Sequence, residues 1–189
     1  MKSSERKAYK SFLRNELSKS LKRINRAARR KKSTKIVQKL IRLSFFKRAC
    51  RILAYAALPA EVQTQGFIEK ALRLQKTVYL PRIHGKTGKM AIYQIKNWSN
   101  DLRKGTYGIL EPKALPSRKG KVSSLDLIVV PGLGFDRKGR RLGRGGGFYD
   151  RFLAKAKHVK KIGLAFREQL LREIPAEAND IRMDKVITD

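Results

Sequence analysis

Apolar side chains recur at helical spacing near the start of the chain, with basic residues between them. Across residues 5–30 they return every three or four positions, beginning with Tyr9 and Leu13. This is the pattern of a helix with one apolar stripe, so we expect one long basic helix over this range. Ser33 is a suitable N-cap for a second helix, whose apolar positions run from 36 to 45.

Short apolar runs alternate with helical stretches through the rest of the chain. This alternation predicts an α/β fold with a mostly parallel central sheet flanked by helices. A length of 189 residues suits one domain, so we expect a single three-layer domain over residues 1–189, with the basic helical part, residues 1–50, packed on the α/β core. Strands are expected at 52–58, 77–80, 90–95, 125–130, 162–166 and 186–187, and helices at 64–74 and 148–157.

Prolines and glycines mark the expected irregular connections. Pro59 and Pro81 are expected to end two of the strands. Turns are expected at 84–88 and around 179–180, and residues 96–124 form a long stretch rich in loops. Long loops in a compact domain are usually functional or disordered.

The composition argues against a secreted or membrane protein. Cys50 is the only cysteine, so an internal disulfide is excluded, which is typical of a reducing compartment. We expect Cys50 to be a small buried residue and not a nucleophile. No run approaches the ~18 consecutive apolar residues of a membrane span, and no apolar segment of a secretory signal follows the N-terminus. A cytoplasmic protein without a membrane partner is therefore expected.

The chain is strongly basic, with 46 Lys and Arg against 15 Asp and Glu and a net charge of +31. Such a field attracts polyanions: nucleic acid, an anionic membrane, or phosphorylated and polyacidic small molecules. The first 51 residues hold 19 of the basic residues and only two acids, Glu5 and Glu16. Charge alone does not choose among these partners, and a basic nucleic-acid-binding protein is the alternative function.

A glycine-rich segment lies between the predicted strand 125–130 and the predicted helix 148–157. Five of the eight residues 137–144 are Lys or Arg, and glycines occupy 145–147. Glycines let backbone N–H groups turn toward an anion, and a helix N-terminus favours negative charge. The segment matches neither the P-loop pattern nor G-x-G-x-x-G. It is either a flexible surface loop or a phosphate-binding loop, and its position between a strand and a helix favours the second interpretation.

The same segment resembles the central motif of the 5-formyltetrahydrofolate cyclo-ligase family, also called methenyltetrahydrofolate synthetase. In that family an apolar strand ends in Phe-Asp and is followed by Arg-Leu-Gly-x-Gly-x-Gly-[Tyr or Phe]-Tyr-Asp. Here these parts are 127–136 and 141–150. The resemblance spans nearly the whole chain, and further pieces match in order at 10–14, 61–64, 78–81, 108–112 and Asp180.

The resemblance implies ATP-dependent ring closure of 5-formyltetrahydrofolate to 5,10-methenyltetrahydrofolate, with release of ADP and phosphate. A formamide oxygen is a poor leaving group, so ATP would first phosphorylate it, and the neighbouring amine would then displace phosphate. Phosphoryl transfer depends on positioning and charge neutralisation, which agrees with a site rich in Arg, Lys and Gly. Mg²⁺ is the implied cofactor, and a monomer is expected. A related ATP-using enzyme acting on another formamide-like substrate is a further alternative.

The resemblance also assigns roles to individual residues. Lys10, Arg141 and Arg144 would be catalytic, and Asp150 and Asp180 would hold Mg²⁺. The residues expected to bind ATP are Lys10, Ser11, Phe12, Leu13, Arg14, Arg141, Leu142, Gly143, Arg144, Gly145, Gly146, Gly147, Phe148 and Tyr149. Those expected to bind the folate are Ala56, Glu61, Arg144, Gly145, Gly146, Gly147 and Phe148.

Several of these residues also have an ordinary structural interpretation. Lys10 and Arg14 lie one helical turn apart and could reach one phosphate chain, or they could be two solvated charges on a basic helix. Asp150 could be an ordinary first-turn acid of a helix, and Glu61 a solvated loop residue. Phe148 stands where many family members have a tyrosine, so a hydrogen bond from that hydroxyl is lost.

Overall fold

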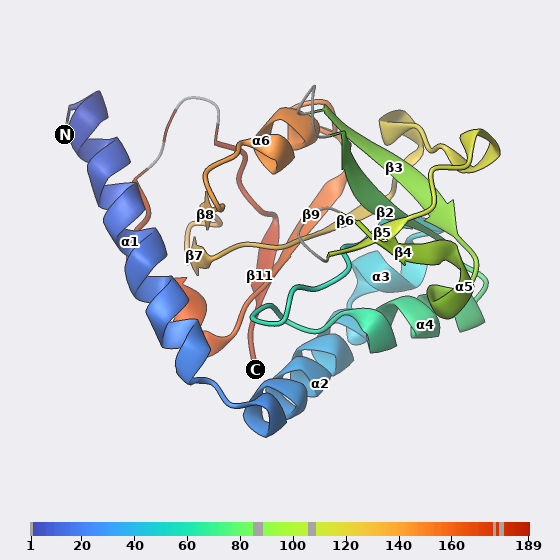
Figure 1. The fold of residues 1–189 in the computed structure, drawn as a ribbon, viewed down its shortest axis with the longest axis horizontal. Helices are drawn as coiled ribbons and strands as arrows, with labels where there is room; N and C mark the ends of the chain where they lie inside the picture. The colour runs from blue at the N-terminus through green and yellow to red at the C-terminus, as the bar shows by residue number, and fades with distance from the viewer. Residues whose placement is uncertain (1, 85–88, 106–108, 176, 178–179) are drawn as a thin grey trace.

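The computed structural model describes residues 2–84, 89–105, 109–175, 177 and 180–189 (Figure 1). Its centre is a six-stranded sheet made of β1 (Arg51–Leu53), β2 (Thr77–His84), β3 (Lys89–Ile95), β6 (Leu127–Val130), β9 (Lys160–Leu164) and β11 (Lys185–Ile187). The strand order is β11-β9-β6-β1-β2-β3. Every neighbouring pair is parallel except β2 and β3. The prediction of a mostly parallel α/β sheet is therefore confirmed.

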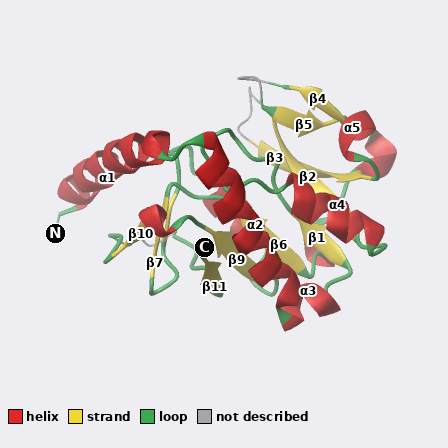
Figure 2. Ribbon diagram, turned by 90° about the horizontal axis from the view of Figure 1, so that it is seen from below, coloured by secondary structure: helices red, strands yellow, loops and turns green. Residues whose placement is uncertain are grey.

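Helices cover both faces of this sheet, which gives three layers. Figure 2 shows α2 (Arg26–Arg42), α3 (Ser44–Arg48) and α4 (Gln65–Arg73) on one face, and α6 (Phe148–Leu153) lies on the other (Figure 1). Alternate side chains of β6 point to opposite faces of the sheet. Leu127 and Val129 belong to the buried cluster under α2 and α4, whereas Ile128 and Val130 pack in the cluster that contains Phe152 of α6.

The basic N-terminal region begins with two helices, as expected, but the break between them falls at residues 24–25, inside the single long helix expected over 5–30. α1 (Ser3–Arg23) is followed by Asn25, which is the N-cap of α2. The Asn25 side chain accepts a hydrogen bond from the backbone N–H of Ala28 at 2.8 Å, which satisfies one of the unpaired donors at the helix start. Ser33, the expected cap, is instead buried within α2 and accepts a hydrogen bond from the Gln63 backbone N–H at 3.0 Å.

α1 lies at one end of the molecule and packs through its apolar stripe (Figure 1). Leu13, Leu17 and Leu21 are buried in the same cluster as β6 and α2. Leu17 lies so close to Gly134 that a Cβ there would come within 2.7 Å of its methyl group. The basic residues of α1 therefore lie on a helix whose apolar side is part of the core.

Several predicted strand ends differ from the structure, and the largest shifts are at the ends of β1 and β2. β1 stops at Leu53 and not at residue 58, because the chain leaves the sheet there. β2 continues through Pro81, which lies opposite Ile92 of β3. β1 has no residue level with Pro81, since its last partner on β2 is Tyr79. No neighbouring strand needs the N–H that proline lacks, so the proline is tolerated inside the strand.

The segment after β6 holds regular structure that the apolar pattern did not indicate. β7 (Gly134–Asp136) pairs with β8 (Arg141–Leu142) and with β10 (Leu170–Leu171). The buried Asp136 carboxylate fixes this arrangement by accepting backbone N–H groups of Lys138, Arg140 and Ile174 at 2.9–3.0 Å. The remaining short elements are α5 (Trp98–Asp101), β4 (Leu102–Lys104), β5 (Leu110–Pro112) and the 3-10 turns Pro116–Arg118, Val122–Ser124 and Arg167–Gln169.

Three remaining expectations concern single residues and short segments. Cys50 is exposed, so the prediction that it is buried was wrong: it lies just outside the sheet, immediately before β1. None of the helices in the described part of the chain is long and apolar enough to cross a membrane. The predicted turns at 84–88 and 179–180, and the matched segment 108–112, fall partly outside the described residues.

Candidate active site

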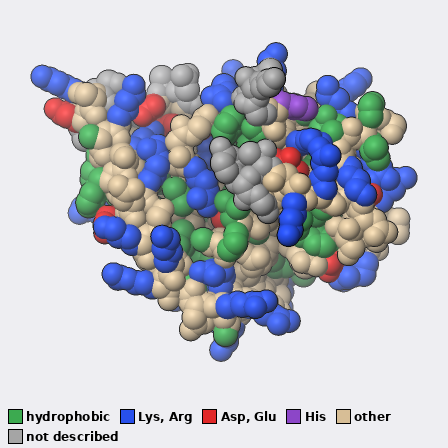
Figure 3. Space-filling model, viewed as in Figure 1, with side chains coloured by type: hydrophobic (Ala, Val, Ile, Leu, Met, Phe, Trp, Pro, Cys, Tyr) green, Lys and Arg blue, Asp and Glu red, His purple; other side chains and the backbone are tan. Residues whose placement is uncertain are grey.

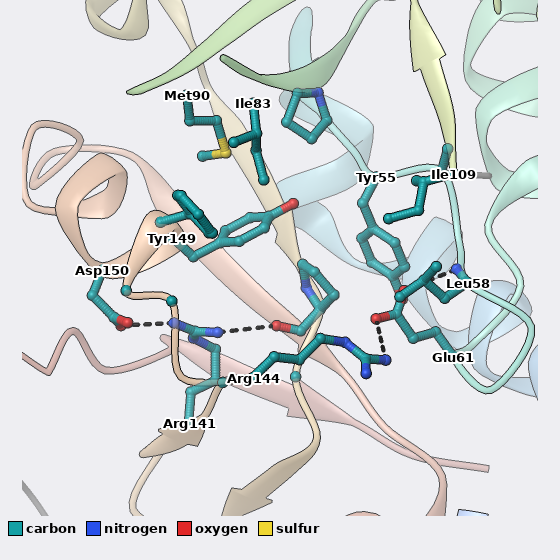
Figure 4. A pocket seen from close by; sticks show the side chains of 18 of the residues that line it. Tyr55, Leu58, Glu61, Ile83, Met90, Ile109, Arg141, Arg144, Tyr149 and Asp150 are labelled. Atoms are coloured by element: carbon teal, nitrogen blue, oxygen red, sulfur yellow. Dashed lines mark hydrogen bonds and ion pairs between the residues drawn. The ribbon is translucent and has the colours of Figure 1, made fainter. Parts of the chain in front are cut away.

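A cavity of about 190 Å³ opens at the edge of the sheet where β1, β2 and β6 end (Figure 4). In an open α/β sheet this is the edge at which ligands bind. Its polar side comes from the segment 141–150, whose arginines, glycines and first α6 residues face the cavity. Its apolar side is lined by Tyr55, Leu58, Pro81, Ile83, Met90 and Ile109.

Arg141 is fixed at the polar side by two partners. Its Nη2 lies 2.7 Å from Asp150 Oδ1, and its Nη1 lies 3.4 Å from the Pro131 carbonyl oxygen. The Arg141 side chain is only 5% exposed, and its guanidinium lies 5.6 Å from the centre of the Tyr149 ring. A buried guanidinium needs such partners, because an unpaired charge out of water is costly. Arg141 is therefore a rigid positive charge that faces the cavity.

Arg144 and Glu61 form an ion pair between two walls of the cavity (Figure 4). Arg144 Nη2 lies 3.1 Å from Glu61 Oε1, and Glu61 Oε2 accepts the Leu58 backbone N–H at 3.0 Å. Glu61 is nearly buried, whereas the Arg144 side chain is 50% exposed. Both oxygens of Glu61 are thus engaged, so it is not the solvated loop residue of the alternative interpretation. Arg144 is the more exposed partner of the two.

The glycine-rich loop lies between α1 and α6. Gly145 and Gly147 have φ values of +104° and +63°, conformations that side chains with a Cβ rarely adopt. Gly147 is also the N-cap of α6. Arg14 of α1 donates from Nε to the Gly143 carbonyl oxygen at 2.9 Å. This bond joins the N-terminal helix to the loop, so Arg14 lies beside the glycines.

Lys10 belongs to a separate network. Its buried ammonium lies 2.8 Å from Asp180 Oδ2 and 3.2 Å from Glu177 Oε1. Neither Lys10 nor Asp180 lines the cavity. On the same helix Leu13 points into the core, and Phe12 is exposed with its ring stacked 6.2 Å from that of Tyr9. The expected ATP segment 10–14 therefore faces several directions, with only Arg14 bonded to the loop.

Two tyrosines border the cavity with neutral hydroxyl groups. Burial raises the pKa of the Tyr149 phenol well above its usual range, with the Glu61 charge acting the same way and Arg141 against it. Burial and the Glu61 charge likewise raise the pKa of Tyr55. The Tyr55 hydroxyl donates to the Val62 carbonyl oxygen at 3.2 Å. No described residue gives the buried Tyr149 hydroxyl a hydrogen-bond partner.

The structure brings most of the predicted site residues to one place. Ser11, Leu142, Gly145 and the α1 residues discussed above are outside the cavity lining, although Gly145 lies near the Arg14 side chain. The predicted residues that line it are Ala56, Glu61, Arg141, Gly143, Arg144, Gly146, Gly147, Phe148, Tyr149 and Asp150.

Sequence reasoning missed the apolar side of the cavity. Ile83 and Met90 are paired residues of the β2–β3 hairpin, and Ile109 precedes β5. Met90 opens an apolar run that is indistinguishable from a core strand when only the sequence is read, and Ile83 stands alone between Arg82 and His84, beyond the predicted strand 77–80. A useful signal was Pro131, which directly follows β6 and lines the cavity.

The carboxylates expected to hold Mg²⁺ are both paired with basic side chains. Asp150 contacts Arg141, and Asp180 contacts Lys10. In the described part of the chain no three His, Cys, Asp or Glu side chains cluster closely enough to hold a metal by themselves. Mg²⁺ commonly binds one or two carboxylates together with substrate phosphates and water. The residues are thus compatible with a metal that arrives with a nucleotide, and not with an all-protein metal site.

Comparison with known proteins gives consistent matches. Residues 6–189 match the model of the 5-formyltetrahydrofolate cyclo-ligase family. A probable 5-formyltetrahydrofolate cyclo-ligase from Caenorhabditis elegans is 32% identical, over 96% of this chain and 93% of the relative. The mouse 5-formyltetrahydrofolate cyclo-ligase is 30% identical, over 93% and 91%. The solved 5,10-methenyltetrahydrofolate synthetase of Aquifex aeolicus superposes with a TM-score of 0.83 at 30% identity, covering 94% of this chain and 88% of its own.

Proposed function

The chain belongs to the 5-formyltetrahydrofolate cyclo-ligase family and has the activity of that ligase, and we propose that it closes the substrate's ring in the cavity beside the glycine-rich loop. The family's reaction is ATP-dependent. It converts 5-formyltetrahydrofolate to the 5,10-methenyl form, with ADP and phosphate as the other products. The observation that supports this site is an apolar cavity bordered by two arginines and a glycine-rich loop.

The folate ring system would occupy the cavity itself. At about 190 Å³ the cavity is smaller than the ~300–1,000 Å³ sites that enclose whole drug-sized ligands. It can therefore take a flat ring between Ile83, Met90 and Tyr55 while the rest of the substrate lies outside. Glu61, with Ala56 beside it, would hydrogen-bond the ring, because its carboxylate is held at the wall of the cavity.

The phosphates of ATP would lie over the glycine-rich loop, between α1 and α6. Arg14 is already bonded to the loop, and Lys10 lies one helical turn away with its charge buried. Arg141 and Arg144 face the junction of this region with the cavity. Preorganised cations at the point where charge develops are the main device by which proteins accelerate phosphoryl transfer.

Chemistry would then follow from this placement. The formyl oxygen attacks the γ-phosphorus and ADP leaves, which turns a poor leaving group into phosphate. The N10 amine attacks the formyl carbon, the C–O bond breaks with its electrons on phosphate, and the N10 proton is lost. Arg141 and Arg144 would neutralise charge on the transferred group. Asp150 and Asp180 would hold Mg²⁺, which supplies further neutralisation of the phosphates when bound.

A direct assay tests this proposal. Purified protein with 5-formyltetrahydrofolate, ATP and Mg²⁺ should produce the near-ultraviolet absorbance of the methenyl product and an equal amount of ADP. Folded protein that forms no product, as judged by chromatography after an acid quench, would sink the proposal.

The remaining assignments concern the protein as a whole. We treat residues 1–189 as one catalytic domain, because α1 supplies Arg14 to a loop more than a hundred residues away. We propose that the protein is a monomer. We also propose that it is cytoplasmic, because the single cysteine, Cys50, is an exposed free thiol of a kind typical of reducing compartments. Binding to nucleic acid is proposed to be non-specific, driven only by the net charge.

A further inference from the structure

Arg144 differs from the other cations of the glycine-rich loop in where its charge lies. Two of those cations converge on Gly143: Arg14 donates from Nε to its carbonyl oxygen at 2.9 Å, and a Cβ on this glycine would come within 2.8 Å of Arg141 Nη1. Arg144 follows directly in the chain, but its guanidinium reaches to Glu61 on the opposite wall of the cavity (Figure 4). The charge of Arg144 is thus held away from the place where the proposed function puts the phosphates.

The two ends of this ion pair are held with unequal strength. Glu61 is built into its wall, because its Oε2 accepts the Leu58 backbone N–H and its own backbone N–H donates to the Leu58 carbonyl oxygen, both at 3.0 Å. Its side chain is only 11% exposed, whereas that of Arg144 is 50% exposed. A half-exposed guanidinium regains water when it leaves its partner, so opening the pair costs little. When the pair opens, Glu61 therefore stays in place and Arg144 moves.

The folate ring carries the same kind of donor as Arg144. Its aminopyrimidinone part has an amino group and a ring N–H on one carbon, which is the N–C–N arrangement of a guanidinium. Glu61 Oε2 is already bonded to Leu58, so Oε1 is the oxygen left for a further donor, and Arg144 Nη2 lies 3.1 Å from it. The folate ring and Arg144 therefore compete for one carboxylate oxygen.

We propose that Arg144 is an internal stand-in for the folate ring, which Glu61 holds across the cavity until the ring takes its place. The released guanidinium then turns to the phosphates of ATP beside Gly143. This inference rests on the proposed function and describes how the same site is regulated. It makes Arg144 available to the nucleotide only when the formyl group that accepts the phosphate is seated.

Such control matters in a protein whose surface attracts ATP whether or not folate is bound. Lys and Arg outnumber Asp and Glu by 46 to 15, and Figure 3 shows many basic and few acidic side chains on one face of the molecule. Without the formyl group, water can attack the γ-phosphorus: the bond to ADP breaks, a bond to the water oxygen forms, and phosphate and a proton are released. Withholding one cation slows this hydrolysis, because charge neutralisation is what accelerates phosphoryl transfer.

The test measures nucleotide binding with and without folate. The probe is the β,γ-imido analogue of ATP with Mg²⁺, whose Kd is determined by calorimetry alone and with saturating 5-formyltetrahydrofolate. The wild type should bind the analogue about fivefold more tightly when the folate is present, which is the upper worth of one partly exposed ion pair.

Variants identify the residues that carry this coupling. E61Q keeps an oxygen for the Leu58 N–H but loses the charge that holds Arg144, so without folate it should bind the analogue about fivefold more tightly than the wild type and hydrolyse ATP faster. E111Q is the matched control, since Glu111 also lines the cavity but pairs with Arg82, and it should behave like the wild type. E61Q/R144Q should lose the gain of E61Q, because Arg144 carries it.

Each outcome decides between separate claims. Equal Kd values for the analogue with and without folate in the wild type would overturn the exchange, and this measurement needs no variant to fold. Tight binding that persists in E61Q/R144Q would reduce the effect to the lost charge of Glu61 and would also overturn it. A wild type that shows the coupling but forms no methenyl product would support the exchange and contradict the proposed function.

Discussion

The chain concentrates positive charge in two places, and the two differ in how the side chains are held. At the active-site cavity Arg141 is buried, is bonded to Asp150 and to the Pro131 carbonyl, and faces the cavity. On α2, Arg26 and Arg30 are exposed and have no acidic partner among the described residues. A fixed charge can stabilise a transition state, whereas a free one can attract and retain an anion but cannot direct chemistry.

The difference follows from the surroundings and not from the residue type. The Asp150 carboxylate and the Pro131 carbonyl oxygen hold the Arg141 side chain in place, at the cost of desolvating its charge. The start of α2 offers no such partners. Mutations that remove a fixed charge should therefore act on kcat, and those that remove a free charge should act on binding and its salt dependence.

The largest effect is expected from Arg141→Ala. Removing one preorganised charge-stabilising donor usually costs about 10²–10³ in turnover, and we expect a loss of that size in kcat. Arg140→Ala is the matched control. That neighbouring arginine bonds Glu173 and the Ile174 carbonyl, away from the cavity. Equal losses of kcat in the two variants would show that the buried position of Arg141 is not what matters.

Asp150→Asn should have the next largest effect. It keeps the size of the side chain but removes the charge that faces Arg141 and, on our proposal, Mg²⁺. A loss of roughly 10–100-fold in turnover is expected, the range seen when a group supporting a metal or catalytic site is changed. Turnover is measured against Mg²⁺ concentration. Partial recovery at high Mg²⁺ is expected, whereas a constant deficit would restrict Asp150 to orienting Arg141.

Arg144 is intermediate between the two regions, because it lines the cavity but is half exposed and, among the described residues, is bonded only to Glu61. Arg144→Ala should therefore lower kcat by roughly tenfold or less, in line with the weaker interactions of exposed charges. The kinetic constants for both substrates are compared with those of Arg141→Ala. A loss as large as that of Arg141→Ala would mean that Arg144 becomes fixed when the substrates bind.

The sequence predicted the polar side of the site because its residues are consecutive. Segment 141–150 needs only a loop and a helix start to bring its arginines, glycines and carboxylate together. The apolar wall could not be predicted, since Ile83 and Met90 meet only through the register of the β2–β3 hairpin. Likewise, nothing in the chain near Lys10 indicates that its charge is met by Asp180, 170 residues away.

The fold could be predicted where the local sequence pattern determines the structure. It could not be predicted where another segment of the chain determines it. The order of strands and helices follows from apolar runs, and these runs gave the parallel sheet. Pro81 was misread as a strand end because its tolerance depends on where β1 stops, which is a property of another segment. The break between α1 and α2 depends on one side chain, Asn25, inside a region where the apolar spacing is continuous.

The smallest effect on turnover is expected from removing the free charges of α2, and this is the sharpest test of the comparison. Arg26, Arg30, Lys31 and Lys35 are exposed, so they are the residues to change to Gln. Arg29 and Lys32 are unsuitable, because both are bonded within the fold. The fourfold variant should turn over 5-formyltetrahydrofolate at a nearly normal rate, since none of the four residues lines the catalytic cavity.

Nucleic-acid binding by the same variants completes the argument. Binding to RNA or DNA by free surface charge is driven by counterion release, and log affinity falls by about 0.9 per phosphate neutralised for each unit of log salt. We expect the wild type to bind both weakly and without sequence preference near physiological salt, and the fourfold variant to bind neither at low salt. Salt titrations of both proteins measure this beside the ligase assay. Tight, sequence-selective binding at physiological salt by a wild type without ligase activity would make the exposed α2 charge, and not the fixed charge at the cavity, the functional region of the molecule.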